Sequence, residues 1–252
     1  MYGNKRRGRI RPLIAYLPKV LKFYDVKRDG ISPLVFVLIL AIGFAANLIP
    51  MKFIGEISIS SVSVSTEELM NLLRATLIMN GISLGSFIFS NLFSSAYLFA
   101  YIRDLRGVSY TARECWSFIG RRFVAIVVLS IINMLAIFTG LFLFIVPGII
   151  LYLMFVFSNC YMMDKDTGII RSLKSSLDLT HGFKGQIFRV IVFFNAIIIL
   201  IPMMIGSSGG PLIYAFVSAF ISAIINLMSQ RLLALMYVDL EYVPSSLDEV
   251  EI

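Results

Sequence analysis

Long runs of apolar residues, separated by short polar segments, dominate the sequence. An α-helix rises 1.5 Å per residue, so about 20 apolar residues cross the roughly 30 Å hydrocarbon core of a bilayer. The uncharged run at 123–163 is too long for one crossing and must fold back once. The pattern therefore predicts six transmembrane helices, at about 31–50, 77–101, 123–145, 147–163, 186–205 and 211–237.

The composition also indicates a membrane protein. Hydrophobic residues make up 58% of the 252 residues and charged residues only 15%, with a mean hydropathy of +0.88. Soluble domains carry about 25% charged residues, so this sequence lacks the polar surface that a soluble enzyme needs. The expected fold is all-α, a polytopic protein of the cell membrane. Its first span follows a long polar segment, so we expect it to be retained rather than cleaved as a signal peptide.

The distribution of Lys and Arg predicts the orientation. Most of these residues fall in the segments 1–30, 102–122 and 164–189, whereas the segment 51–76 has only two. Because cytoplasmic loops carry the excess of Lys and Arg, both termini and both basic connections are predicted to be cytoplasmic. The net charge of +7 then reflects topology and anionic headgroups. Nucleic-acid binding is not expected, since no reader motif accompanies the charge.

These features predict three regions along the chain. Residues 1–30 form a basic cytoplasmic segment with an interfacial helix at about 10–24, and residues 31–238 form the six-span membrane domain. Residues 239–252 form an acidic cytoplasmic tail.

Short segments with proline mark the predicted outer turns. Within Ile145–Gly148, Pro147 has no N–H to donate and Gly148 tolerates turn geometry, so the chain is expected to reverse there. Similar segments end the first and fifth spans, at Pro50 and Pro202. The six spans are thus expected to pair into three helical hairpins.

Amphipathic segments precede the outward-going spans on the cytoplasmic side. At 167–181, apolar residues recur at helical spacing opposite a polar face, with Asp166 or Thr167 expected to cap the start and Gly182 to end the helix. A similar segment at 110–120 precedes the third span. Both are predicted to be interfacial helices lying in the headgroup layer. The apolar face of the first is Ile169, Ile170, Leu173 and Leu177.

Basic residues beside these helices are the candidate contacts for anionic lipid headgroups or for another membrane protein. Each Lys or Arg near an anionic surface contributes about 1 kcal/mol to binding. An alternative stays open, in which the helix at 167–181 is only an anchor that sets the tilt of the following span. The candidate contact residues are Arg171, Lys174, Lys184, Arg121 and Arg122.

Four segments between Gly85 and about Val190 carry a resemblance to a known family. They are Tyr97–Gly107, Phe118–Phe123, Ile145–Ile149 and Ser172–Gly182. This part of the chain resembles a bacterial family of unassigned function that includes YciC-like proteins and the membrane domain of glycerophosphoryl diester phosphodiesterases. The resemblance implies a six-helix integral membrane protein and transfers no catalytic or binding residue. The soluble phosphodiesterase domain of some relatives has no counterpart here, since His181 is the only His and no His-Glu pair with supporting acids exists.

The sequence offers no recognisable catalytic, cofactor or metal site. It contains no Walker motif, glycine fingerprint, HExxH or nucleophile elbow, so an enzyme is not expected. Cys115 and Cys160 are expected to be free thiols. No ionisable residue falls at a predicted bilayer centre, because Arg74, Arg189 and Arg231 lie close enough to an interface to extend toward it.

Uncharged polar residues are the remaining candidates for an intramembrane role. We expect the amides to make interhelical hydrogen bonds, with a polar substrate path as the alternative. The small residues between Gly81 and Ala96 predict close helix packing, with a lining for a lipid-sized groove as the alternative. The amides concerned are Asn80, Asn91, Asn133, Asn159, Asn195, Asn226 and Gln230.

The expected function follows from excluding ion-coupled transport and intramembrane catalysis. The absence of midplane charges disfavours ion-coupled transport, and the absence of acid or metal clusters disfavours intramembrane catalysis. The expected function is therefore a non-enzymatic accessory or regulatory protein that contacts lipids or another membrane protein. A small permease or the membrane subunit of a transporter is the alternative.

The predicted orientation can be tested with single cysteines. A membrane-impermeant thiol reagent applied to intact cells should label Ser61→Cys in the first outer loop and leave Ser246→Cys in the tail unlabelled. The unsubstituted chain controls for the native thiols of Cys115 and Cys160. Labelling of the tail position, alone or with the loop position, would contradict the predicted topology.

Overall fold

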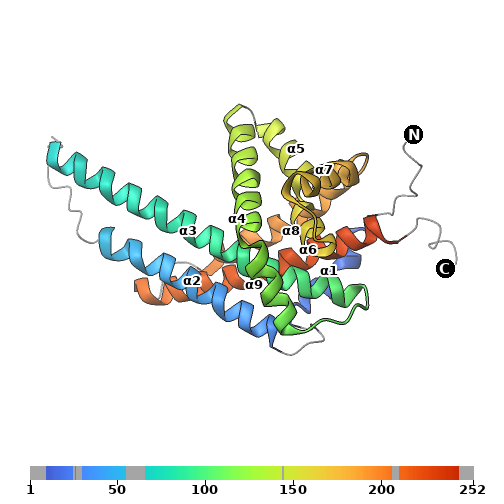
Figure 1. Cartoon of the computed structure of the whole chain (residues 1–252). Coiled ribbons are helices and arrows are strands. Elements are labelled where there is room, and N and C mark those ends of the chain that lie inside the picture. The colour runs from blue at the N-terminus through green and yellow to red at the C-terminus, as the bar shows by residue number, and fades with distance from the viewer. Residues whose placement is uncertain are drawn as a thin grey trace.

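The computed structural model describes residues 10–24, 26, 30–54, 66–143, 145–205 and 210–243, and every regular element within them is an α-helix (Figure 1). The prediction of an all-α fold is confirmed. The helices are α1 (Leu13–Leu21), α2 (Ile31–Ile54), α3 (Thr66–Leu105), α4 (Ala112–Leu143), α5 (Ile145–Phe155), α6 (Ser158–Lys165), α7 (Ile169–Thr180), α8 (Lys184–Ile205) and α9 (Gly210–Glu241).

Segments of membrane-spanning length and hydropathy overlap five of the predicted spans, as expected of a membrane-embedded protein. The sixth prediction, at 186–205, coincides with the helix α8, but its side chains from residue 195 onward lie outside the described residues. The five segments are Ile31–Ile49, Leu69–Leu105, Ala112–Ala136, Val146–Lys165 and Leu212–Glu241.

Two helical arms diverge from a common base (Figure 1). Helices α2, α3 and α9 pack along one another as the first arm, and α4 and α5 pair as the second. The polar base consists of α1, α6, α7 and the C-terminal turns of α3 and α9. Its interior holds the largest buried side chains, including Tyr97, Phe99, Phe157 and Tyr237. Apolar side chains on the arms remain exposed, as in helices that face lipid.

Helix α4 is longer than the sequence predicts, because it absorbs the expected interfacial helix at 110–120. Thr111 and Glu114 form a capping box at its start, in which the Glu114 N–H donates to the Thr111 hydroxyl at 3.1 Å and the Thr111 N–H donates to the Glu114 carboxylate at 2.8 Å. Gly120 does not end this helix. A glycine inside a helix costs only about 1 kcal/mol, and burial of Phe118 and Ile119 against the core outweighs that cost.

The turn predicted at Ile145–Gly148 is displaced toward the N-terminus. Helix α4 ends at Leu143 and α5 begins at Ile145, so Pro147 and Gly148 lie inside the first turn of α5. A proline is tolerated in a first helical turn, where its missing N–H would have no intrahelical acceptor. Helices α2 and α8 likewise continue past Pro50 and Pro202 instead of ending there.

The predicted fourth span is interrupted. Helix α5 ends at Phe155 and α6 begins at Ser158, with a two-residue turn between them. Ser176 of α7 bridges this break, because its hydroxyl donates to the Met154 carbonyl at 2.8 Å and accepts from the Phe157 N–H at 3.2 Å. Backbone groups freed by a break at membrane depth need such partners, so α7 is part of this span's structure.

Helix α7 turns a hydroxyl-bearing face toward the protein, while Ile169 and Leu173 of its predicted apolar face pack partly against the core. Its buried residues are Ser172, Ser176, Leu179 and Thr180, whereas Ile170 is 79% exposed. Its N-cap is Gly168 rather than Asp166 or Thr167. Gly182 has φ +90° between α7 and α8, a conformation that glycine adopts without steric cost.

We predict that Ser176→Ala destabilises the protein, because the Met154 carbonyl and the Phe157 N–H would lose a shared partner. The expected loss is about 1–3 kcal/mol in the free energy of unfolding, measured by denaturant titration in micelles. Ser175→Ala is the matched control, since the Ser175 side chain makes no hydrogen bond among the described residues. Equal stability of the two variants would show that the bridge contributes nothing.

Candidate functional site

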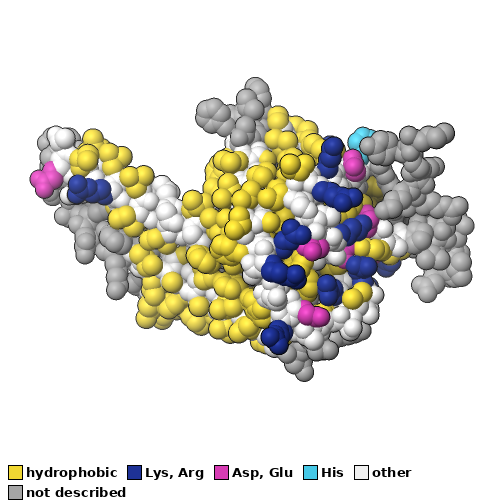
Figure 2. Space-filling model, in the orientation of Figure 1, with side chains coloured by type: hydrophobic (Ala, Val, Ile, Leu, Met, Phe, Trp, Pro, Cys, Tyr) yellow, Lys and Arg dark blue, Asp and Glu magenta, His cyan; other side chains and the backbone are white. Residues whose placement is uncertain are grey.

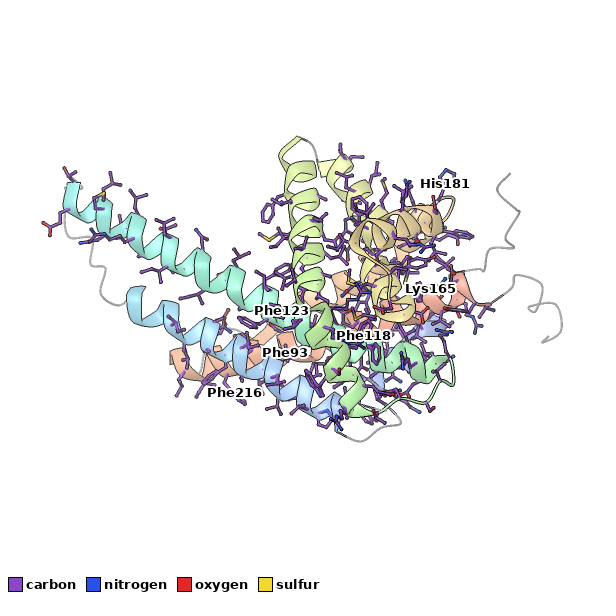
Figure 3. The ribbon with its side chains drawn as sticks, viewed as in Figure 1. Phe93, Phe118, Phe123, Lys165, His181 and Phe216 are labelled. Atoms are coloured by element: carbon purple, nitrogen blue, oxygen red, sulfur yellow. The ribbon has the colours of Figure 1, made fainter. Side chains whose placement is uncertain are left out.

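Charged side chains gather mainly at the polar base, while apolar side chains cover the arms (Figure 2). A smaller charged group marks the far tip of α3, where Glu67 and Arg74 are exposed. Figure 3 shows Lys165 and His181 on the base, whereas Phe93, Phe118 and Phe123 lie where α3 and α4 cross. The base is therefore the part of the described chain with the most ionic chemistry.

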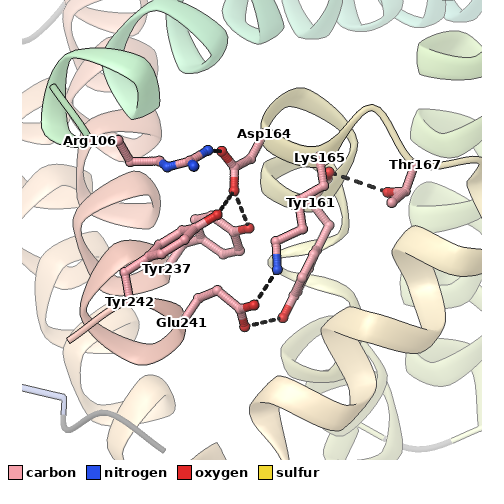
Figure 4. A network of polar contacts seen from close by, with 8 residues as sticks. All are labelled: Arg106, Tyr161, Asp164, Lys165, Thr167, Tyr237, Glu241 and Tyr242. Carbon is pink, nitrogen blue, oxygen red and sulfur yellow. Dashed lines mark hydrogen bonds and ion pairs between the residues drawn. The ribbon is translucent and has the colours of Figure 1, made fainter. Parts of the chain in front are cut away.

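Asp164, at the end of α6, is the centre of the main polar network (Figure 4). Its side chain is completely buried and forms an ion pair with Arg106 after α3. It also accepts hydrogen bonds from the Tyr237 hydroxyl at 2.8 Å and from the Tyr242 hydroxyl. One carboxylate thus joins three segments that are far apart in the sequence.

A second carboxylate, that of Glu241, reinforces the same junction. It pairs with Lys165 and accepts a hydrogen bond from the Tyr161 hydroxyl at 2.7 Å (Figure 4). Burial raises the pKa of Tyr242, and the hydrogen bond to Asp164 raises it further. The Tyr242 phenol therefore stays protonated at neutral pH and remains a donor.

Two further acids of the base also have partners. Asp166 accepts from the Arg122 guanidinium, with the Nε atom at 2.7 Å, and Asp239 lies 3.5 Å from Arg11. Asp239 also accepts from the Tyr16 hydroxyl at 2.8 Å, which ties α1 to the end of α9. Burial raises the pKa of Tyr16, and the charge of Asp239 adds to the rise.

The predicted contact residues divide into two groups. Arg122 is held by Asp166 and by the Asp166 backbone carbonyl at 2.9 Å, so its role in the structure is to link α4 to the segment before α7. The other four cations have no acidic partner among the described residues, and all but the partly exposed Lys184 are exposed. These four are Arg121, Arg171, Lys174 and Lys184.

The four cations are spread over a surface instead of converging on one pocket. Arg121 is next to Arg122, which bonds Asp166 just before the start of α7. Lys184 begins α8, after the other end of α7. The twelve residues of α7 separate these points by about 18 Å at 1.5 Å per residue. This arrangement suits several small anionic groups better than one large anion.

Exposed apolar residues accompany these cations. On α7, Ile170 is next to Arg171. The exposed fractions of Ile14 and Leu21 on α1 and of Tyr24 just after it are 78%, 57% and 69%. Exposed apolar side chains beside Lys and Arg are typical of helices that lie at a membrane interface. The predicted interfacial helix at about 10–24 covers these residues, but Pro12 and Pro18 obscure the helical period there, so the sequence does not identify its exposed face.

Arg231 does not extend to an interface, contrary to the sequence-based expectation. It is 5% exposed, its guanidinium lies 4.2 Å from the Tyr101 ring centre, and it donates to the Tyr97 hydroxyl at 3.4 Å. Aromatic rings can accept a cation face-on, so the tyrosines of α3 cover this charge within the base.

Several amides make the expected interhelical hydrogen bonds. Asn159 donates to Ser95 at 2.9 Å, and Asn133 donates to Ser158 at 3.2 Å. The side chain of Asn195 lies outside the described residues.

Close packing of the small residues is confirmed only near the C-terminal end of the 81–96 stretch. Ser94, Ser95 and Ala96 are buried. Around Gly81 and Gly85, no atom beyond the chain neighbours and the adjacent backbone of the same helix lies within 4 Å of the position that a Cβ would take. The earlier part of the stretch is therefore not closely packed.

No metal site accompanies these features in the described part of the chain, where no group of three His, Cys, Asp or Glu residues could hold an ion. Both cysteines are buried free thiols. No family model matches the chain, and comparisons with curated proteins and with solved structures also gave no match.

We predict that Asp164→Asn strongly destabilises the protein, because Arg106 would lose its buried counter-charge. The expected loss is about 2–4 kcal/mol in the free energy of unfolding. Asp166→Asn is the matched control two residues away, since the Asp166 side chain is 58% exposed and its ion pair with Arg122 is worth about 1 kcal/mol or less. Denaturant titration in micelles measures both, and a larger loss for Asp166→Asn would contradict the central role of Asp164.

Proposed function

We propose that this protein is a non-enzymatic membrane protein that acts through contact with anionic lipid headgroups at its polar base. Arg121, Arg171, Lys174 and Lys184 provide the positive surface for this contact, and the exposed apolar residues of α1 and α7 enter the headgroup layer beside them. An accessory or regulatory role toward a neighbouring membrane protein follows from such a surface.

One observation carries this proposal. Asp164, Asp166, Asp239 and Glu241 are all engaged by Arg, Lys or Tyr side chains of the same chain. The four cations named above lack an acidic partner among the described residues, so their charge is available to an external anion. Lipid phosphates are the anions that a membrane supplies next to an interfacial helix.

The proposed topology has six spans in three hairpins, with both termini in the cytoplasm. The hydrogen bond from Tyr16 to Asp239 supports it, because it brings α1 and the end of α9 to the same end of the molecule. The basic connections after α3 and α6 meet at that end as well, through Arg106 and Asp164. An excess of Lys and Arg on one side favours the cytoplasmic assignment of that side.

Membership of the YciC-like family is part of the proposal and rests on the sequence motifs alone. Two of them coincide with functional elements of the fold. Ile145–Ile149 opens α5, and Ser172–Gly182 contains most of α7 together with the bridging Ser176.

A small permease is the second candidate function, favoured by the break between α5 and α6. Transporters often build substrate sites from discontinuous helices, whose freed backbone groups line a cavity. Here Ser176 occupies the freed groups of Met154 and Phe157, which weakens this candidate relative to lipid contact.

The proposal predicts that Arg171→Ala/Lys174→Ala loses anionic lipid. At about 1 kcal/mol per cation, retention of phosphatidylglycerol should weaken roughly tenfold to thirtyfold, as measured by native mass spectrometry of the detergent-solubilised chain. Lys52→Ala/Arg74→Ala is the charge-matched control from the segment 51–76, which is predicted to lie on the opposite side of the membrane, and should bind as the parent does.

Two outcomes would contradict the proposal. Retention by the α7 variant equal to that of the parent would leave α7 as an anchor only. An equal loss in both variants would show that total charge, and not the polar base, determines lipid binding.

A further inference from the structure

A cavity of about 220 Å³ lies where the two arms meet, between α3, α4, α5, α6 and α9. Its lining comes from four of the five membrane-length segments, so it lies at membrane depth. It adjoins the break between α5 and α6, since Phe155 and Val156 contribute to its wall. Its polar lining residues are Asn91, Ser130, Asn133, Tyr152, Asn159 and Gln230.

Several of these polar groups lack hydrogen-bond partners. The Oδ1 atoms of Asn133 and Asn159 are buried and have no partner among the described residues. Ser130 and Gln230 also make no side-chain hydrogen bond within the described chain. Buried polar groups in native proteins are nearly always satisfied, so this cluster points to a molecule that is bound there in the membrane.

The cavity selects for an uncharged guest. None of its lining residues is Asp, Glu, Lys, Arg or His, so a charged ligand would have no counter-ion at membrane depth. The remainder of its wall is apolar, including Leu129 and Leu233, and Phe87 is 42% exposed on the side of the α3 arm. The apolar part of the guest can therefore pack against this wall and extend out of the cavity.

The hydrogen-bonding groups select for a hydroxyl. The buried carbonyl oxygens of Asn133 and Asn159 need donors, while the Gln230 amide N–H groups and the Ser130 hydroxyl can donate to an acceptor. A hydroxyl group meets both requirements with a single heavy atom. The terminal torsion of an Asn side chain has a broad energy profile, so the buried oxygens can turn toward a guest in exchange for the amide bonds to Ser158 and Ser95.

We infer that this cavity binds the hydroxyl end of a neutral amphiphile from the bilayer. The apolar part of the guest lies between the α3 arm and the α4–α5 arm, which diverge from this point (Figure 1). The site is separate from the cations of the polar base and does not depend on the function proposed for them.

Photo-crosslinking of the full chain in vesicles tests the inference. The probe is a long-chain alcohol with a diazirine in its chain, and labelled peptides are identified by mass spectrometry. We expect labels on segments that line the cavity, with competition by hexadecanol at least fivefold stronger than by hexadecyl methyl ether, which cannot donate a hydrogen bond. Equal competition by the ether, or labels only outside these segments, would overturn the inference.

Two variants locate the polar contacts. Gln230→Leu removes an amide that makes no hydrogen bond within the described chain, so the fold should persist while labelling falls about fivefold. Asn226→Leu is the matched control, because Asn226 bonds Ser94 and does not line the cavity. Labelling of Gln230→Leu at the parent level would overturn the inference. Retention of phosphatidylglycerol by the same samples reports separately on the polar base.

Discussion

The buried carboxylate of Asp164 is the interaction on which the architecture depends. It holds Arg106 from the end of α3 together with Tyr237 and Tyr242 from the end of α9, while its own backbone ends α6. Removing a carboxylate from water costs several kcal/mol, and this arrangement offsets the cost with one ion pair and two phenol hydrogen bonds. Because the three helices meet at this group, both arms start from a fixed base. Glu241 and Lys165 close the same junction from the neighbouring turn.

The polar base and the apolar arms solve different physical problems. In the arms, helices satisfy their own backbone and present apolar side chains to lipid, so they need few specific contacts. In the base, each of four acids finds a partner within the chain, and a subset of cations is left for external anions. Helix α7 adds an exposed apolar residue, Ile170, beside Arg171, and α1 presents exposed apolar residues of its own, such as Ile14. This combination supports the proposed contact with lipid.

The break between α5 and α6 links the base to the interior of the membrane domain. Ser176 of α7 replaces the missing intrahelical partners, so an apparently peripheral helix stabilises a span. The amide-lined cavity lies on the other side of the same break. The amide nitrogens of Asn133 and Asn159 donate to serines of neighbouring helices, whereas their carbonyl oxygens have no partner among the described residues.

The sequence by itself determined the membrane class, the all-helical fold and the approximate position of each long helix. These follow from local hydropathy, because a segment in lipid must satisfy its backbone internally and can do so as a helix without help from distant residues. It also named Arg121, Arg171, Lys174 and Lys184, together with Arg122, as candidate contact residues. Only the tertiary structure decided the partners of Asp164 and Arg122, the burial of Arg231, the break at 156–157 and the inward hydroxyl face of α7. Each of these depends on a residue far away in the sequence: Arg106 is 58 positions from Asp164, and Ser176 is 19 positions from Phe157. Local periodicity carries no information on such pairs, whereas the cost of an unpaired buried polar group determines them once the helices are packed.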